Sequence, residues 1–217
     1  MIDDRIAYIK ISNFSENTSD EFKSTLAELE REGMKGFILD LRQNPGGVIN
    51  GCIEIAQELV PKGTITSVIK RDGSKEVYTS DLAAAKFPIV VLINHNSASA
   101  SELLSGALQD TKAALIVGET SYGKGSVQTL IPMAHNDGLK LTIAKYYTPN
   151  GKCIDGVGIT PDVEIKMTES PHPMYDLNLN EEDDPQLAKA EELLLHQVGA
   201  GKILFDDDFW KTSDNMH

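Results

Sequence analysis

The sequence is poor in the residues that mark disulfide-rich or metal-binding proteins. It has two cysteines and one tryptophan among 217 residues, and aromatic residues make up 6% of the chain. Cys52 and Cys153 are too few and too far apart for a zinc site, and they form either one disulfide or, by default, two free thiols. The five histidines show no metal-ligand spacing. The sequence therefore predicts no metal and no cofactor.

Basic residues and long apolar runs are also scarce. There are 20 Lys and Arg against 33 Asp and Glu, which gives a net charge of −13. Nucleic-acid binding needs clustered positive charge, so we expect no nucleic-acid partner. No run approaches the ~18 to 20 apolar residues of a membrane span, so membrane association would need segments outside this sequence. The first residues also lack the apolar core of a signal peptide.

The apolar residues are arranged for an α/β fold. A chain of 217 residues with 41% hydrophobic residues can bury one substantial core. Strands that alternate with helices imply right-handed βαβ crossovers and a mainly parallel sheet. The expected elements are a strand at 6–11, a helix from the capping box Thr18-Ser19-Asp20-Glu21 to Gly33, a strand at 37–41, a helix at 49–60, a strand at 89–93, a helix at 101–112 and a strand at 113–117.

Two antiparallel hairpins are expected beside this sheet. The first joins strands 65–70 and 76–79 around Asp72-Gly73, a strong hairpin signal. The second joins strands 127–132 and 139–147 around Asn136-Asp137-Gly138. A last strand is expected at 163–167.

The carboxyl-terminal part differs in composition from the core at 1–167. Residues 168–184 are polar and acidic and are expected to form a linker or surface loop. In the remaining part, 185–217, a helix should start at Pro185 with Asp184 as its cap. Its apolar residues Leu187, Ala190, Leu193 and Leu194 lie on one side. This helix either docks on the core or pairs with another subunit as a homodimer, and 203–217 is its tail.

Two loops indicate a catalytic site. Ser97, Ser99 and Ser101 follow the apolar strand 89–93 and precede a helix, where unpaired N–H groups favour negative charge. Serine is also a preferred N-cap, so capping alone would explain an isolated motif of this kind. Lys124, between two glycines, follows the next apolar strand. Because a desolvated lysine can replace histidine as the base, the two loops together suggest a serine–lysine pair.

Four segments carry a family resemblance: Leu39 to Gly47 (LDLRQNPGG), Asn96 to Glu102 (NSASASE), Gly118 to Gln128 (GETSYGKGSVQ) and Gly158 to Val163 (GITPDV). In this order they resemble the carboxyl-terminal processing proteases, or tail-specific proteases, of peptidase family S41. The resemblance implies a crotonase/ClpP-like core and a serine endopeptidase that cleaves proteins near their carboxyl termini. It also implies protein substrates with apolar carboxyl-terminal tails and a location outside the cytoplasm.

The resemblance implies a role for each site residue. Ser99 would be the nucleophile and Lys124 its base, oriented by Gln128 or, as in some members, by a residue matching Asp110. From its position alone, Asp110 is more typical of a helix-surface or ion-pair residue, and Glu102 of a charge at a helix N-terminus. The oxyanion would be met by the N–H of Ala100 and by that of Gly46 or Gly47, which the sequence does not separate; as an isolated motif, Asn44 to Gly47 would be an ordinary turn.

Members of this family usually have a PDZ domain before the core, and no such domain is expected here. Two other functions compete with proteolysis. Gly118 to Lys124 matches most of a phosphate-binding loop, but Gly125 stands where that motif needs Ser or Thr, and strand rather than helix should follow. The second alternative is a non-catalytic binding module on the same fold for apolar ligands or peptides.

Overall fold

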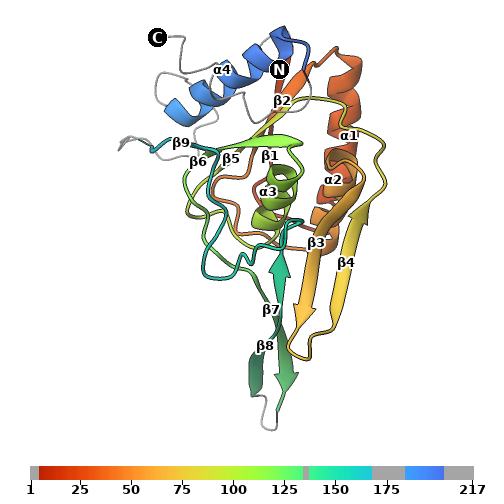
Figure 1. Ribbon diagram of the computed structural model, residues 1–217, viewed down its shortest axis with the longest axis vertical. Helices are drawn as coiled ribbons and strands as arrows, with labels where there is room; N and C mark the ends of the chain where they lie inside the picture. Colours follow the sequence, from red (N-terminus) through yellow and green to blue (C-terminus); the bar gives the residue numbers. More distant parts are fainter. Residues whose placement is uncertain (1–4, 134–136, 168–183, 203–217) are drawn as a thin grey trace.

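Two sheets of different character build the molecule (Figure 1). The computed structural model describes residues 5–133, 137–167 and 184–202. One sheet has the strand order β1-β2-β5-β6-β9, with every neighbouring pair parallel. Its strands are β1 (Ile6–Lys10), β2 (Gly36–Asp40), β5 (Ile89–Ile93), β6 (Ala114–Gly118) and β9 (Val163–Glu164).

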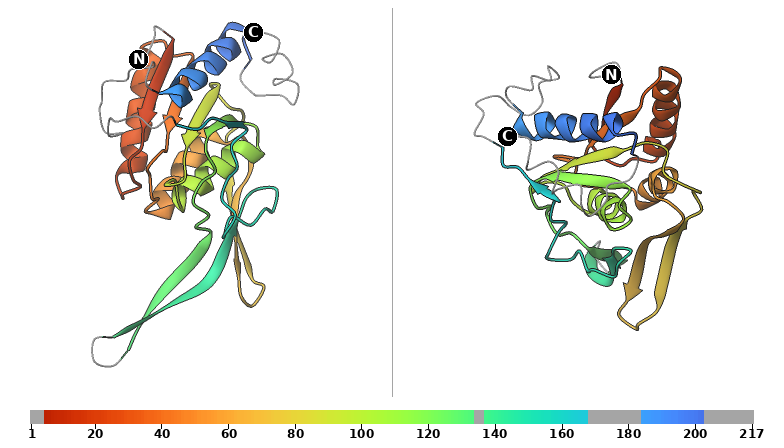
Figure 2. Two further views of the ribbon diagram at one scale, coloured as in Figure 1. Left: turned by 90° about the vertical axis from the view of Figure 1, so that its left-hand side faces the viewer. Right: turned by 45° about the horizontal axis from the view of Figure 1, so that its top comes forward.

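The second sheet is antiparallel and has the order β4-β3-β8-β7. Its strands are β3 (Gly63–Lys70), β4 (Lys75–Ser80), β7 (Ser126–Pro132) and β8 (Gly138–Tyr147). The β7–β8 pair projects well beyond the body of the molecule as a two-stranded ribbon (Figures 1 and 2).

Helices cover both faces of the parallel sheet because its strands are apolar on both sides. The helices are α1 (Thr18–Arg31), α2 (Ile49–Leu59), α3 (Ala100–Asp110) and α4 (Pro185–Gly199). Phe37 and Leu39 of β2 belong to the core shared with α1, α2 and α3, whereas Ile38 belongs to the core shared with α4. This alternation is what a period of two residues per strand requires. Figure 2 shows α4 lying across the sheet on the side away from α3.

The predicted element order is confirmed, and most bounds agree within two residues. Two details are wrong. The expected strand at 163–167 is regular only over β9. The Thr18 capping box does not form, because Asn17 is the N-cap of α1 and the Thr18 hydroxyl instead accepts a hydrogen bond from the Ser15 N–H at 2.9 Å.

The carboxyl-terminal helix docks on the core. Asp184 caps α4 by accepting a hydrogen bond from the Leu187 N–H at 2.9 Å, as predicted. The apolar side of the helix is buried against the sheet and is therefore not available to another subunit; its residues are Leu187, Ala190, Leu193 and Leu194. The predicted linker at 168–184, except for Asp184, lies outside the described residues, as do the turn residue Asn136 and the tail at 203–217. Within the described residues, no helix is both long and apolar enough to cross a membrane.

Candidate active site

The loops that carry most of the predicted site residues lie at one edge of the parallel sheet. Asn44 to Gly47 follow β2, Ser99 follows β5, and Lys124 follows β6. Because β2, β5 and β6 are parallel neighbours, their carboxyl ends open onto the same edge. Ligands of open parallel sheets commonly bind at such an edge.

Ser99 occupies the turn between β5 and α3 in a backbone conformation that side chains rarely adopt. Its φ is 56° and its ψ is −113°. A residue held in this way costs roughly 1–3 kcal/mol and needs surrounding bonds to persist. Those bonds are present, because the Ser99 carbonyl accepts the N–H groups of Glu102 and Leu103, both at 3.0 Å.

Accessibility separates the three serines of the motif. The hydroxyls of Ser97 and Ser101 are fully buried and donate to the backbone carbonyls of Leu41 (2.9 Å) and Asn44 (3.0 Å). Ser99 is only half-buried. Of the three, Ser99 is therefore the serine that a substrate can reach.

Glu102 links the serine loop to the lysine loop. Its side chain is 1% exposed. Its Oε2 accepts the backbone N–H groups of Ser99 (2.9 Å) and Lys124 (2.7 Å). Its Oε1 accepts the Gly123 N–H at 2.6 Å and the Ser121 hydroxyl at 2.5 Å. A buried carboxylate needs such donors in place of water, so Glu102 fixes both loops at once.

The Lys124 amine does not bond to Ser99 in this structure. The backbone nitrogens of Ser99 and Lys124 both bond to one oxygen, which places them less than about 6 Å apart. The Lys124 side chain is nevertheless exposed, and its Nζ makes no hydrogen bond or ion pair with any residue that the structure describes. Because a lysine side chain spans roughly 6 Å, a change of rotamer can bring the amine to the Ser99 hydroxyl.

The first glycine after β2, Gly46, lies directly against the nucleophile, whereas Gly47 lies against the Phe14 backbone. A Cβ at Gly46 would come within 2.8 Å of the Ser99 Cβ and 2.9 Å of the Ala100 nitrogen. The Gly46 N–H is already engaged, since it donates to Oδ1 of the buried Asn44 at 2.8 Å. In the described part of the chain, no hydrogen bond uses the N–H of Gly47 or of Ala100. Of the two glycines, Gly47 is therefore the one whose N–H has no hydrogen-bond partner among the described residues.

The two residues considered for orienting Lys124 lie elsewhere. Gln128 is exposed on β7 and pairs with Thr142 beside a β-bulge, and no hydrogen bond among the described residues joins its side chain to Lys124. Asp110 ends α3, about 16 Å along the helix axis from Ser99 at 1.5 Å per residue. Its Oδ2 accepts the Asn150 N–H at 2.8 Å. The structure thus brings Ser99, Ala100, Gly46, Glu102 and the Lys124 backbone together, and leaves Gln128 and Asp110 apart.

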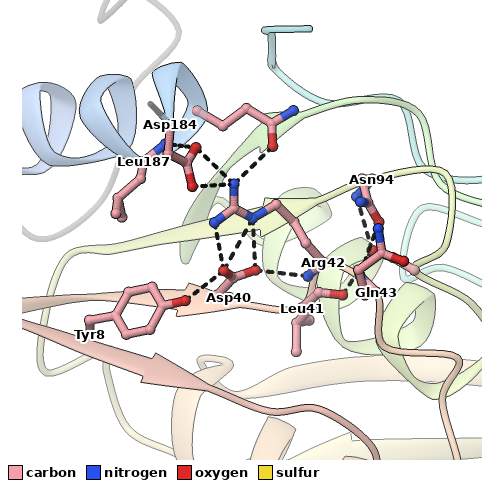
Figure 3. Close-up of polar contacts among 10 residues, drawn as sticks. Tyr8, Asp40, Leu41, Arg42, Gln43, Asn94, Asp184 and Leu187 are labelled. Atoms are coloured by element: carbon pink, nitrogen blue, oxygen red, sulfur yellow. Dashed lines mark hydrogen bonds and ion pairs between the residues drawn. The ribbon is translucent and has the colours of Figure 1, made fainter. Parts of the chain in front are cut away.

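A buried charged cluster supports the loop after β2 (Figure 3). The Arg42 guanidinium bonds both oxygens of Asp40, at 2.7 to 3.1 Å, and reaches Asp184 at 2.9 Å and Gln186 at 3.1 Å. The Tyr8 hydroxyl donates to Asp40 at 2.7 Å. This cluster joins β1, β2 and α4 immediately before Asn44 to Gly47. Arg42 and Asp184 are 142 residues apart, so no local sequence pattern indicates this cluster.

The electrostatics of this cluster are those of a fixed ion pair. Burial lowers the pKa of Arg42, but the charges of Asp40 and Asp184 raise it by a larger amount. The net result is a pKa above the ordinary value for arginine. Burial and the neighbouring Asp40 raise the pKa of Tyr8 as well. Both groups therefore keep their protons across the range in which enzymes work.

The remaining predictions concern the cysteines, metals and the phosphate-binding loop. Cys52 and Cys153 are free thiols, as the default predicted. Among the described residues, no group of three or more His, Cys, Asp or Glu could hold a metal ion. The segment after Gly125 is strand β7, so the Gly118–Lys124 loop does not open into the helix that a phosphate-binding loop requires.

Comparison with known proteins agrees with the resemblance seen in the motifs. Residues 5–165 match Peptidase family S41. The chain is 44% identical over 162 residues to a carboxyl-terminal-processing protease of Synechocystis sp., covering 74% of this chain and 38% of that protein. It is 41% identical over 166 residues to carboxy-terminal processing protease CtpB of Bacillus subtilis, covering 76% and 35%.

A solved structure extends the likeness to three dimensions. The photosystem II D1 C-terminal processing protease superposes with a TM-score of 0.70 at 36% identity, covering 74% of this chain and 42% of that chain. The α/β architecture is therefore that of this protease, whereas the crotonase/ClpP-like description of the core stays a prediction. The chain spans less than half the length of the relatives compared above. From the family match and these identities, the chain belongs to peptidase family S41.

Proposed function

We propose that this chain is the catalytic core of a serine endopeptidase that cleaves proteins near their carboxyl termini, with Ser99 as nucleophile and Lys124 as base. The observation that carries the proposal is the shared carboxylate oxygen of Glu102, which binds the backbone N–H groups of both residues. Family membership supports a peptidase. The proposed cleavage near the carboxyl terminus is based on the names of the relatives, which are carboxyl-terminal processing proteases.

The first half of the reaction forms an acyl-enzyme. The base in this step is a neutral amine, and a bound substrate that displaces water from an amine favours its neutral form. Neutral Lys124 takes the proton of the Ser99 hydroxyl as Oγ bonds to the peptide carbonyl carbon. The oxyanion accepts hydrogen bonds from Ala100 and Gly47, each typically worth ~3 to 4 kcal/mol of barrier. The C–N bond then breaks, and the leaving amine takes the proton from Lys124.

The second half releases the product. Lys124 takes a proton from water, and the resulting hydroxide attacks the ester carbonyl of acylated Ser99. The C–O bond to Ser99 breaks, and its oxygen recovers the proton from Lys124. Neither half needs a metal or cofactor. Because the amine must lose its proton first, activity should rise from neutral to alkaline pH.

The test is cleavage of an unfolded protein with an apolar carboxyl-terminal tail. Ser99→Ala and Lys124→Ala should each reduce kcat by ~10⁴-fold or more, as removal of such groups does in other serine proteases. Lys62→Ala, which removes an exposed lysine away from the site, is the matched control and should retain full activity. Equal turnover in all four proteins would contradict the proposal.

The exposed amine of Lys124 favours one second candidate, the non-catalytic binding module for apolar peptides. A module of this kind would bind the tail peptide with no cleavage at any pH. Substrates with apolar tails and a location outside the cytoplasm follow from the family resemblance and remain part of the proposal.

A further inference from the structure

One face of the β7–β8 ribbon is apolar and open to water. Ile131 pairs with Leu139, and Thr129 pairs with Leu141, so these side chains share a face. Ile143 lies two residues further along β8, at the β-bulge where Val127 pairs with Ala144 and Gln128 with Thr142. We call Ile131, Leu139, Leu141 and Ile143 the ribbon strip; each is between 40% and 44% exposed.

The ribbon strip leads to the catalytic loops. β7 starts two residues after Lys124, and its first residue, Ser126, pairs with Lys145. At the root of the ribbon, Ile143 and Lys145 line a groove of about 300 Å³ together with Ile69 and Arg71 of the neighbouring hairpin. Lys145 in turn bonds Asp155 at 2.9 Å, and the Asp155 backbone lies against Gly125.

Exposed apolar side chains also surround the site itself. Val48 follows Gly47, and Tyr122 lies two residues before Lys124; they are 37% and 68% exposed. Val157, 55% exposed, lies on a turn whose backbone touches Gly123. Of the nine large apolar side chains exposed in the described residues, only Val77 lies away from both these loops and the ribbon. Exposed apolar surface is thus concentrated along one path through the molecule, and such concentration marks interaction surfaces.

The backbone of the ribbon offers a second recognition element. β7 is the last strand of its sheet, so its outer edge has no strand partner among the residues that the structure describes. An edge of this kind can accept an extended peptide as an added strand. The main-chain hydrogen bonds then contribute affinity for any peptide sequence, and the apolar side chains favour peptides that are themselves apolar.

We propose that the β7 edge and the ribbon strip bind an extended apolar segment of the unfolded polypeptide substrate and lead it to Ser99. The proposal rests on the proposed function and names the substrate surface of that same site. The occupant is the substrate because eight of the nine large apolar side chains exposed in the described residues lie on the ribbon or beside the catalytic loops, and β7 begins two residues after Lys124. In addition, an added strand on β7 runs directly toward Lys124.

Binding is tested first, in the full chain made inactive by Ser99→Ala. An unfolded polypeptide with apolar segments, labelled for fluorescence anisotropy, is the probe. Leu139→Thr with Leu141→Thr removes apolar surface while keeping residues that favour strands, and should weaken binding by ~10-fold or more. Lys140→Thr, on the opposite face of the same strand, should not change the affinity. Unchanged affinity in the Leu139→Thr/Leu141→Thr protein would overturn the proposal.

Amide hydrogen exchange tests the edge without altering the ribbon. The amides of β7 should exchange more slowly when the polypeptide is bound to the Ser99→Ala protein. Binding without any change in β7 exchange would overturn the proposal, whether or not the ribbon variants fold. Sedimentation reveals the rival occupant, a second copy of this chain. If the leucine substitutions abolished a dimer and left polypeptide binding unchanged, the assignment to substrate would be wrong.

Activity separates this proposal from the function on which it rests. With active protein, the two leucine substitutions should lower kcat/KM for the long polypeptide mainly through KM. A short activated ester, which cannot reach the ribbon, should react at the parental rate. Suppose that neither the parent nor the leucine variant hydrolyses either substrate, but the leucine substitutions still weaken polypeptide binding. The proposed function would then be wrong, and the proposal that the ribbon binds polypeptide would hold.

Discussion

Two buried carboxylates lie near the same edge of the parallel sheet, and different kinds of partner stabilise them. Asp40, fully buried, faces a guanidinium at 2.7 Å that is itself tied to α4. Glu102, almost as buried, is held by three backbone N–H groups and one hydroxyl. The first arrangement locks elements together with a fixed charge pair. The second arrangement positions two loops, and it leaves the nearby Lys124 amine without a partner among the described residues.

This difference predicts separate consequences for stability and for catalysis. Breaking the Arg42 cluster should unfold the protein more readily, because a buried charge loses its partner. Breaking the Glu102 cluster should mainly disturb the relative position of Ser99 and Lys124.

The largest effect is expected from Arg42→Ala. It leaves Asp40 buried without a cation, and loss of one partner of a buried pair typically costs about 3–5 kcal/mol. Denaturant unfolding measures the loss of free energy. Arg42→Lys keeps the charge but not the forked geometry of the guanidinium. Its free energy of unfolding should lie between those of the parent and Arg42→Ala. A loss below about 1 kcal/mol would show that the cluster does not lock the fold.

The next effect is expected from Glu102→Ala. Misplacing the reacting groups by about 1 Å can cost ~10²-fold in rate, so kcat should fall by at least that factor. Glu102→Gln keeps one acceptor oxygen and should recover part of the loss. Steady-state kinetics on the unfolded substrate, with folding checked by circular dichroism, provide the measurement. If a folded Glu102→Ala protein kept the parental kcat, Glu102 would not be needed to position Ser99 and Lys124.

A smaller effect is expected from Gly46→Ala. The added methyl group would meet the Ala98 carbonyl at 2.7 Å and the Ser99 Cβ at 2.8 Å, and a φ of +96° disfavours alanine. We expect kcat to fall ~10- to 100-fold, since the nucleophile must shift. Gly199→Ala is the control, because a Cβ there meets nothing within 4 Å. If both alanine variants kept full activity, the tight packing of Gly46 on Ser99 would have no catalytic role.

The smallest effect concerns the two thiols. Burial raises the pKa of Cys52 to about 12, so its thiol stays protonated and inaccessible at pH 8. Cys153 is only half-buried. Ellman's reagent should therefore titrate one thiol rapidly in the native protein and a second only after unfolding. The raised pKa also means that stability falls as pH rises above about 9, because only the unfolded chain releases this proton. Rapid reaction of both thiols would show that the core around Cys52 opens readily.

The sequence predicted whatever depends on local pattern. The apolar runs fixed β5 and β6 nearly to the residue, and Asp184 was correctly placed as the cap of α4. Thr18 was assigned wrongly, because the capping-box pattern does not show that its hydroxyl bonds a preceding loop residue. The roles of Arg42 and of Glu102 as a link depend on partners far along the chain, so no local pattern indicates them.

The choice between the glycines after β2 shows the same limit. Sequence alone left Gly46 and Gly47 equal. The Asn44 side chain separates them, because it takes the N–H of Gly46 and leaves that of Gly47 available. The exposure of Lys124 likewise depends on what covers its loop, which is a property of the assembled molecule.

The most direct test of the central claim is labelling with a fluorophosphonate, in which the serine oxygen displaces fluoride from phosphorus. We expect mass spectrometry to find the adduct on Ser99 in the parent and in Lys62→Ala, and to find it greatly reduced in Lys124→Ala. Equal labelling in Lys124→Ala, or an adduct on another serine, would contradict the serine–lysine site.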